Sequence, residues 1–280
     1  MEAKRTLTLR DAVNRIFDGS SILLFPGHES AALAFEIIHQ GKKDLTIITS
    51  SYCFTADLLV RGNAVKRVLS GGHDLWTYPS ESPAAIIEVP SGLLRSQLAA
   101  ALTGISCVAM QVPPQAAEVF PELYRGMDDA GACLAHAIVP DLAILHAARG
   151  DFSGNVQLDP IENGLMSGDL LYAQAAKQSL VSVEQIVTKE AIAMNEKQTI
   201  LRAEQAPLLI ELPYGAYPCG YVSRYHADEA WLAQYRQAQT DAVFLQTALP
   251  AFPTGGSWYD DLQRLGFHRL MALTTNRRGE

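Results

Sequence analysis

Short apolar runs that stop at glycine, proline or small polar residues recur along the chain and alternate with segments of helical periodicity. The run SILLFPG ends at Pro26 and Gly27, and the run VKRVLSGG ends at Gly71 and Gly72. Continuous apolar runs of this length are typical of strands buried on both faces of a parallel sheet. Because parallel strands need crossover connections, helices are expected on both faces of the sheet. The pattern therefore predicts a three-layer α/β/α sandwich with a mainly parallel sheet.

The expected elements follow one another without a linker or an internal repeat. Helices are predicted at 8–17, with Thr8 as N-cap, at 30–39, at 92–105, and at 228–239 as an exposed helix. Strands are predicted at 20–27, 45–49, 64–73, 84–89, 105–114, 141–147, 179–187 and 207–218. We therefore expect a single domain over 1–280, with a C-terminal appendage at about 240–280.

Composition excludes several classes of function. A net charge of −8 argues against binding to a phosphate backbone, because nucleic-acid-binding proteins concentrate Lys and Arg on one face. The four cysteines are scattered without zinc-type or redox spacing, so reduced, mostly buried thiols are expected and no metal site. The chain has no apolar stretch of about 20 residues that could span a bilayer, and no signal-peptide pattern. A cytoplasmic protein without membrane contact is the expectation.

Candidate site residues lie where the predicted strands end, because ligands of open parallel sheets bind at the carboxyl ends of strands. In the loop that follows the first strand, Gly27 and Ser30 are candidates for substrate binding. His28 and Glu29 of the same loop can act as acid or base, or can simply form part of a helix N-terminal cap. Both interpretations stay open at this stage.

Further candidates lie at the ends of later strands. Gly71 and Gly72 allow a backbone to approach a ligand closely, or simply make a turn. Glu88 lies in the apolar run AAIIEV, where a carboxylate is costly unless it is paired or faces a cleft. Arg149 and Gly150 are substrate-binding candidates, although an ion pair from Arg149 to Asp151 could merely brace the loop.

Four segments in a fixed order resemble the A subunit of class I coenzyme A transferases, closest to the glutaconate type. They are FEIIHQGKKDLTIITSS, HAARGDFSGNVQ, AAKQSLVSVEQIV and ELPYGAYPCGY, and the resemblance extends from about Ile22 to Gln239. It implies the coenzyme A transferase (NagB/RpiA-like) fold. The first loop departs from the family pattern, because FPGHES stands where A subunits usually carry a Gly-Gly turn and Pro26 removes a backbone N–H donor.

The resemblance implies a two-chain enzyme that moves coenzyme A between an acyl-CoA and a carboxylic acid. A glutamate attacks the thioester and is converted to a glutamyl-CoA intermediate, which is covalent catalysis by a carboxylate. That glutamate normally belongs to a partner B subunit, so no nucleophile is assigned to this chain. Coenzyme A is expected as a substrate, with no permanently bound cofactor. The partners implied are the B subunit, the acyl-CoA and the carboxylate.

Two alternative functions stay open, and one short motif resembles the catalytic turn of the family by chance. The chain could be part of a ring-opening hydrolase that acts on a cyclic acyl-CoA, or a non-catalytic ligand-binding module. Glu162, with Asn163 and Gly164, spells the core of the family's catalytic turn. It follows a loop rather than a strand, so we interpret it as a solvated carboxylate near a helix start and only as a weak catalytic candidate.

Overall fold

The computed structural model describes residues 6–72, 76, 82, 84–111, 124–125, 132–159, 167–205, 207–221, 224–237 and 258–274. Its centre is a mixed sheet in which seven parallel strands follow the order β4-β3-β2-β1-β8-β10-β12. The last part of β8 pairs with β9 in antiparallel fashion, and β9 with β11. The bounds are β1 Ser21–Leu24, β2 Leu45–Thr49, β3 Val65–Ser70, β4 Ala85–Glu88, β8 Leu142–Asp151, β9 Val156–Gln157, β10 Gln178–Val187, β11 Thr199–Leu201 and β12 Leu208–Glu211.

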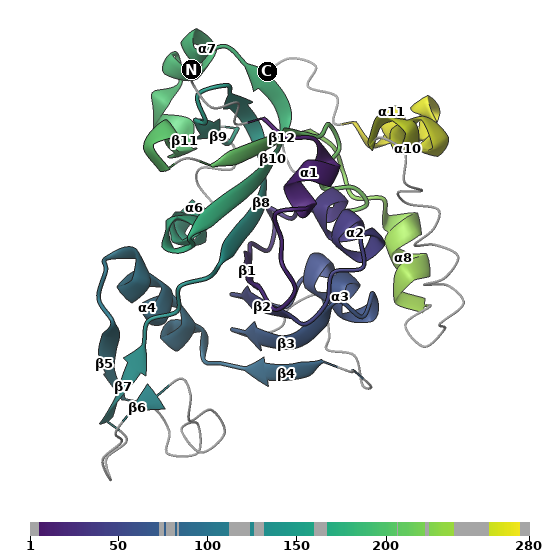
Figure 1. Ribbon diagram of the computed structural model, residues 1–280. Coiled ribbons are helices and arrows are strands. Elements are labelled where there is room, and N and C mark those ends of the chain that lie inside the picture. Colours follow the sequence, from purple (N-terminus) through teal and green to yellow (C-terminus); the bar gives the residue numbers. More distant parts are fainter. Residues whose placement is uncertain are drawn as a thin grey trace.

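Helices cover both faces of this sheet (Figure 1). One face packs against α1 (Leu9–Val13), α2 (Ala31–His39), α3 (Phe54–Arg61), α8 (Glu229–Gln237), α10 (Trp258–Leu265) and α11 (Phe267–Leu273). The other packs against α4 (Ser91–Leu102), α6 (Ser167–Leu170) and the 3-10 turn Leu171–Ala175. Ile22 and Leu24 of β1 point into the first core, whereas Leu23 points into the second. Burial on both faces explains why this strand is apolar throughout, and the predicted three-layer sandwich is confirmed.

Short elements complete the described parts of the chain. Beyond β10, α7 (Lys189–Ala193) and the 3-10 turns Glu196–Gln198 and Ala203–Gln205 lead to β11 and β12. The predicted N-cap of the first helix is confirmed, because Thr8 Oγ1 accepts a hydrogen bond of 3.1 Å from Asp11 N. This helix ends at Val13, earlier than its apolar pattern suggests.

The strand predicted at 105–114 forms part of a second sheet. β5 (Cys107–Gln111) pairs with β7 (Ala132–His136), and β7 with β6 (Tyr124–Arg125), all in antiparallel fashion. β5 is only partly buried, so the prediction of a strand inside the parallel sheet was wrong. Cys133 and His136, whose spacing resembles one face of a helix, lie on strand β7 and point to opposite sides of it.

The helix predicted at 228–239 is anchored more deeply than its polar sequence suggests. Leu232 and Tyr235 of α8 are buried, and Tyr235 OH donates a hydrogen bond of 2.8 Å to Asp57 Oδ2 in α3. Trp231 stacks on Tyr235 with ring centroids 5.5 Å apart. One side of α8 therefore belongs to the core, and the expectation of a fully exposed helix was wrong.

Candidate functional site

The strand order reverses at β1, which lies between β2 and β8. The chain proceeds from β1 to β2, β3 and β4 on one side, and β8, β10 and β12 lie on the other. Loops that leave neighbouring strands in opposite directions open a crevice at their carboxyl ends, where ligands of open α/β sheets bind. A cavity of about 370 Å³ lies there, lined by Phe25, Pro26, His28, Ser50, Ser51, Gly71, Gly72, Ser91, Arg95, Asp169 and Leu170.

Two glycines form the floor where β3 ends. A Cβ atom on Gly71 would lie 2.4 Å from Ser50 O and 3.3 Å from Ser91 Cα, so only glycine fits between these two backbones. Gly72 has φ +140, and its carbonyl accepts a hydrogen bond of 2.8 Å from Tyr52 N. The predicted substrate-binding pair Gly71 and Gly72 thus lines the cavity, and the loops after β2 and β3 are tied together by backbone contacts.

The opposite wall comes from α4 and α6. Ser91 is the first residue of α4, whose N-terminal end has no side-chain cap and no acidic residue in its first turn. One turn later, Arg95 binds Asp169 through two hydrogen bonds, Nε to Oδ1 at 3.0 Å and Nη2 to Oδ2 at 3.1 Å. A two-pronged pair of this kind fixes both side chains and neutralises the carboxylate. The wall therefore offers a helix N-terminus and hydroxyl groups to a ligand.

The loop after β1 separates its two titratable side chains. His28 lines the cavity, whereas Glu29 turns toward α3 and accepts hydrogen bonds from Thr55 N at 2.7 Å and Thr55 Oγ1 at 2.9 Å. Removal from water raises the pKa of Glu29, and these hydrogen bonds counteract the shift only in part. Glu29 therefore caps a helix, although the helix is α3 and not the α2 that follows it directly. Gly27, with φ +81, is exposed and does not line the cavity.

A chain of buried hydrogen bonds reaches the same loop from β8 and β10. Ser182 lies opposite His146 in the sheet, with Oγ and Nδ1 2.8 Å apart, and its Oγ lies 2.7 Å from Ser30 Oγ. His146 Nε2 lies 2.7 Å from Glu184 Oε1, which also accepts a hydrogen bond of 2.9 Å from Tyr225 OH. Hydroxyl, imidazole and carboxylate follow one another as in a nucleophilic triad. Ser182 and His146 are wholly buried, however, so this network holds the loop in place.

Because this network contains the carboxylate of Glu184, the stability of the fold depends on pH. Burial by itself raises the pKa of Glu184, but the hydrogen bond and charge of His146, with bonds from Tyr214 N and Tyr225 OH, outweigh burial and lower the pKa below its ordinary value of 4.5. A carboxylate with a lowered pKa in the fold stabilises it above the unfolded-state pKa, and this contribution is lost as the pH falls. We expect the free energy of unfolding, measured in urea, to fall as the pH drops through and below the ordinary value of 4.5. Glu184→Gln should be less stable at pH 7 and less sensitive to acid; an unchanged acid dependence would contradict this assignment.

Other predicted residues lie elsewhere. Arg149 Nη2 donates a hydrogen bond of 2.7 Å to Asp159 Oδ1, and Asp151 accepts hydrogen bonds from the backbone N–H groups of Gly154 and Asn155. The expected Arg149–Asp151 pair was therefore wrong. Gly150 packs against β12, since a Cβ atom there would lie 2.7 Å from a methyl group of Leu209.

Two of the weak catalytic candidates are carboxylates whose setting the sequence left open. Glu88 is exposed at the end of β4, so the argument from a costly buried carboxylate does not apply to it. It is not among the described residues that line the strand-end cavity. Glu162 lies outside the described residues.

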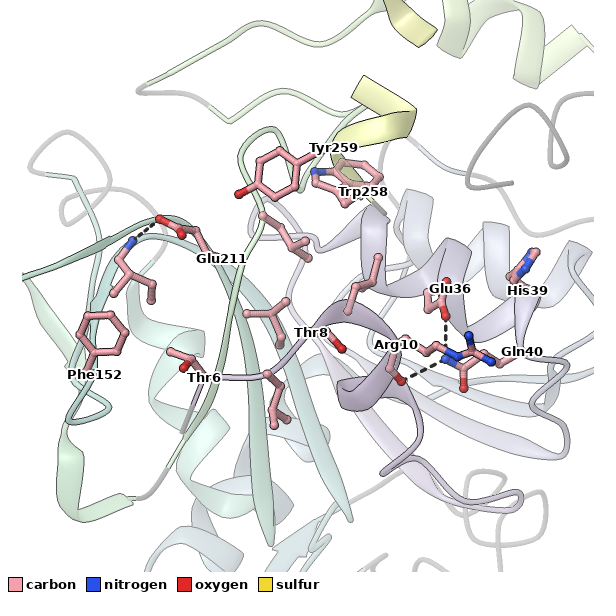
Figure 2. Close-up of a pocket in the computed structure, with 15 residues that line it drawn as sticks. Thr6, Thr8, Arg10, Glu36, His39, Gln40, Phe152, Glu211, Trp258 and Tyr259 are labelled. Atoms are coloured by element: carbon pink, nitrogen blue, oxygen red, sulfur yellow. Dashed lines mark hydrogen bonds between the residues drawn. The ribbon is translucent and has the colours of Figure 1, made fainter. Parts of the chain in front are cut away.

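A larger cavity, of about 730 Å³, lies at another part of the sheet (Figure 2). It is bordered by the amino-terminal segment, α2, the end of β12 and α10, whose Trp258 and Tyr259 face it. Several polar groups of its wall are already engaged: Gln40 donates hydrogen bonds to Glu36 Oε1 and to Arg10 O, and Glu211 accepts one from Ile186 N. None of the described candidate site residues lines this cavity, so size alone does not mark the site.

The four cysteines are free thiols in the structure. Cys53 and Cys133 are buried, and Cys107 and Cys219 are half-buried. In the described ranges, no three His, Cys, Asp or Glu side chains gather as ligands for a metal ion. Across those same ranges, every helix is too short or too polar to cross a bilayer.

Two known proteins have sequences similar to that of this chain. The chain is 28% identical over 258 residues to an uncharacterized protein of Archaeoglobus fulgidus, covering 83% of this chain and 56% of that protein. It is 28% identical over 264 residues to the A subunit of the 3-oxoadipate CoA-transferase of Pseudomonas knackmussii, covering 85% of this chain and 91% of that subunit. The chain thus spans little more than half of the first relative and nearly all of the second.

Solved structures share the architecture. Glutaconate coenzyme A-transferase from Acidaminococcus fermentans superposes with a TM-score of 0.80 at 18% identity, covering 98% of this chain and 96% of that one, which establishes the shared fold. The decarboxylase AibA/AibB gives a TM-score of 0.70 at 26% identity, covering 89% of this chain and 99% of that one. The model of the family "Coenzyme A transferase" matches residues 6–199, a segment that contains β1 to β3 and the cavity at their ends. The chain belongs to the coenzyme A transferase family.

Proposed function

We propose that this chain is the A subunit of a heteromeric CoA-transferase and that a partner B subunit supplies the nucleophilic glutamate. The cavity at the ends of β1, β2 and β3 is then the part of the active site that receives the acyl group. The start of α4 offers backbone N–H groups, and Ser50 and Ser91 offer hydroxyls, which suit the oxygens of an acyl group. A two-chain assembly is supported by the relative that is itself the A subunit of a transferase and by the two-part name of the neighbour AibA/AibB.

The observation that carries this proposal is that, among the described residues, the carboxylates next to the cavity are already occupied. Asp169 is held by both prongs of Arg95, and Glu29 is turned away to cap α3. A nucleophilic carboxylate must be free to attack and must be ionised. Asp169 is not free, and the raised pKa of Glu29 disfavours its ionised form. A glutamate from a second chain would be both free to attack and ionised.

The reaction then proceeds in two exchanges. The partner's carboxylate oxygen attacks the thioester carbonyl, the C–S bond breaks and coenzyme A leaves as a thiolate, which gives an acyl-glutamyl anhydride. The thiolate attacks the glutamyl carbonyl, so the first acid leaves as a carboxylate and a glutamyl-CoA thioester remains. A second carboxylate repeats these steps in reverse. Each tetrahedral intermediate carries an oxyanion, which fixed N–H donors stabilise.

A second candidate, part of a ring-opening hydrolase for a cyclic acyl-CoA, is favoured by one observation. The cavity presents the imidazole of His28, a group that can hydrogen-bond to a substrate or to water, in the loop where the family pattern has glycine. The related AibA/AibB is a decarboxylase, so members of this fold carry out chemistry other than transfer.

Purification with and without the product of the neighbouring gene tests the proposal. The chain alone should not exchange coenzyme A between acyl groups, whereas the complex should, and borohydride should trap a glutamyl-CoA adduct on the second chain. Robust exchange by the single chain would refute a nucleophile in trans. Consumption of a cyclic acyl-CoA by the complex, without exchange and without an adduct, would favour the hydrolase instead.

A further inference from the structure

His28 lines the strand-end cavity, and one nitrogen of its ring is buried and unsatisfied. Its side chain is 3% exposed, and its Nδ1 is buried without a hydrogen-bond partner among the described residues. Leaving a buried polar atom unpaired costs about 1–3 kcal/mol. Such groups are rare in native proteins. Because Nδ1 has almost no accessible surface, the ring nitrogen that can meet a ligand in the cavity is Nε2.

The backbone of His28 is held firmly on both sides. His28 N donates a hydrogen bond of 3.0 Å to Phe25 O, and His28 O accepts one of 2.8 Å from His146 N at the switch between β1 and β8. The ring meets Tyr221 edge-on with centroids 6.4 Å apart, and Tyr221 in turn meets the His146 ring at 4.9 Å. The imidazole is thus fixed by its backbone and by ring packing, and no described side chain takes up the hydrogen-bonding capacity of Nδ1.

The charge state of His28 narrows its chemistry. Burial, with a smaller contribution from the neighbouring His146, lowers the pKa of His28 to about 4, and a contact with the backbone of His146 opposes this only weakly. At neutral pH the ring is therefore uncharged, with one N–H donor and one lone pair. Thioester carbonyl, oxo and carboxylate oxygens only accept hydrogen bonds. Toward any of these atoms, His28 must act as a donor.

We propose that His28 donates a hydrogen bond from its uncharged ring to an oxygen of the acyl group that occupies the cavity beside Ser50, Ser51 and Gly72. This inference rests on the proposed function and adds one contact to it. An uncharged N–H donor favours an uncharged acceptor oxygen, such as that of a carbonyl, over a methylene group at the same place. A site built to hydrogen-bond an oxygen rejects analogues that lack it, because its own polar group is then left unpaired. His28 is thus assigned as a residue that determines specificity for oxygen-bearing acyl groups.

Two substitutions separate a ligand contact from a structural role. His28→Phe keeps a ring of similar shape but has no nitrogen, whereas His28→Gln keeps an uncharged N–H donor of similar reach. In the complex of both subunits, His28→Phe should lower kcat/KM by about 10- to 100-fold. Its melting temperature should stay the same or rise, because a buried unpaired nitrogen has been removed. His28→Gln should restore most of kcat/KM, and His268→Phe, exposed on α11, should change neither quantity.

A structural role for His28 gives the opposite results. If His28→Phe has the kcat/KM of the wild type, or if His28→Phe and His28→Gln both lose activity together with melting temperature, the assignment is wrong. A measurement without turnover complements these variants. In protein labelled with ¹⁵N-histidine, saturation with an acyl-CoA should move the ring nitrogen signals of His28, identified by their loss in His28→Gln; signals that do not move would refute the contact.

Failure of this inference can be told apart from failure of the proposed function. A wild-type complex that exchanges no coenzyme A while the His28 signals respond to acyl-CoA contradicts the transferase proposal alone. Exchange by the wild type and by His28→Phe at equal rates contradicts the His28 contact alone.

Discussion

Asp57→Leu is expected to lower the free energy of unfolding by about 3–5 kcal/mol, the usual cost of removing one partner of a buried ion pair. Asp57 is wholly buried, and its Oδ2 lies 2.7 Å from Arg61 Nε, a side chain that is only 8% exposed. The same carboxylate accepts hydrogen bonds from Tyr52 OH at 3.2 Å and from Tyr235 OH at 2.8 Å. Leucine fills the volume but neutralises no charge and accepts no hydrogen bond.

Urea unfolding followed by circular dichroism measures this change. The matched control is Glu196→Leu, which removes an ion pair to Arg202 in which both side chains are more than half exposed. That substitution should change the free energy of unfolding by less than about 1 kcal/mol. A loss for Asp57→Leu no larger than that of the control would contradict the role assigned to the buried carboxylate. Because Tyr235 belongs to α8, we also expect α8 to lose protection from hydrogen exchange first.

Gly71→Ala is expected to have a large effect on catalysis for so small a substitution. The added Cβ would lie 2.4 Å from Ser50 O and 3.2 Å from Ser50 C, both backbone atoms that side-chain rotation cannot move. Overpacking of this kind costs about 1–3 kcal/mol. Because the loops after β2 and β3 line the cavity together, a shift of about 1 Å there should lower kcat/KM by about 100-fold or more.

Gly92→Ala provides a control at the same cavity wall. Gly92 lies in the first turn of α4, and a Cβ atom there would meet no heavy atom within 4 Å. Alanine is the better helix former, so this variant should be as stable as the wild type or slightly more stable. Steady-state kinetics of the complex, together with melting curves, compare the two variants. Wild-type activity in Gly71→Ala would show that the backbones at the cavity floor yield without consequence.

Much of the fold was predictable from sequence because it depends on local pattern. The β2 strand Leu45–Thr49 and the helix α4 over Ser91–Leu102 follow directly from their apolar runs and periodicity. The strand at 105–114 was assigned to the wrong sheet, since an apolar run does not tell which partner a strand will have. In the structure that strand pairs with β7 and is only partly buried. The helix α3 (Phe54–Arg61) was not predicted at all.

The site was predictable only where the local backbone conformation determines it. Gly71 and Gly72 were predicted to line the site because a glycine pair at the end of a strand indicates a turn that a ligand can approach closely. The partner of Arg149 was mistaken, because Asp159 follows β9, whose antiparallel pairing with β8 brings it to Arg149, whereas Asp151 is used within its own turn. The link from His146 to Ser182 depends on the register of two strands. Its sequence signal is a pair of polar residues at alternate positions, Ser182 and Glu184, on either side of Val183.

The place of His28 at the point where the strand order reverses has an evolutionary consequence. The backbone of β1 and β8 meets there through hydrogen bonds that do not depend on which side chain follows Gly27. Descendants of a common ancestor can therefore exchange the side chain at this one position, and with it the chemistry offered to a substrate, while inheriting the sheet unchanged. Divergence of substrate range in this lineage should accordingly be concentrated at the position of His28.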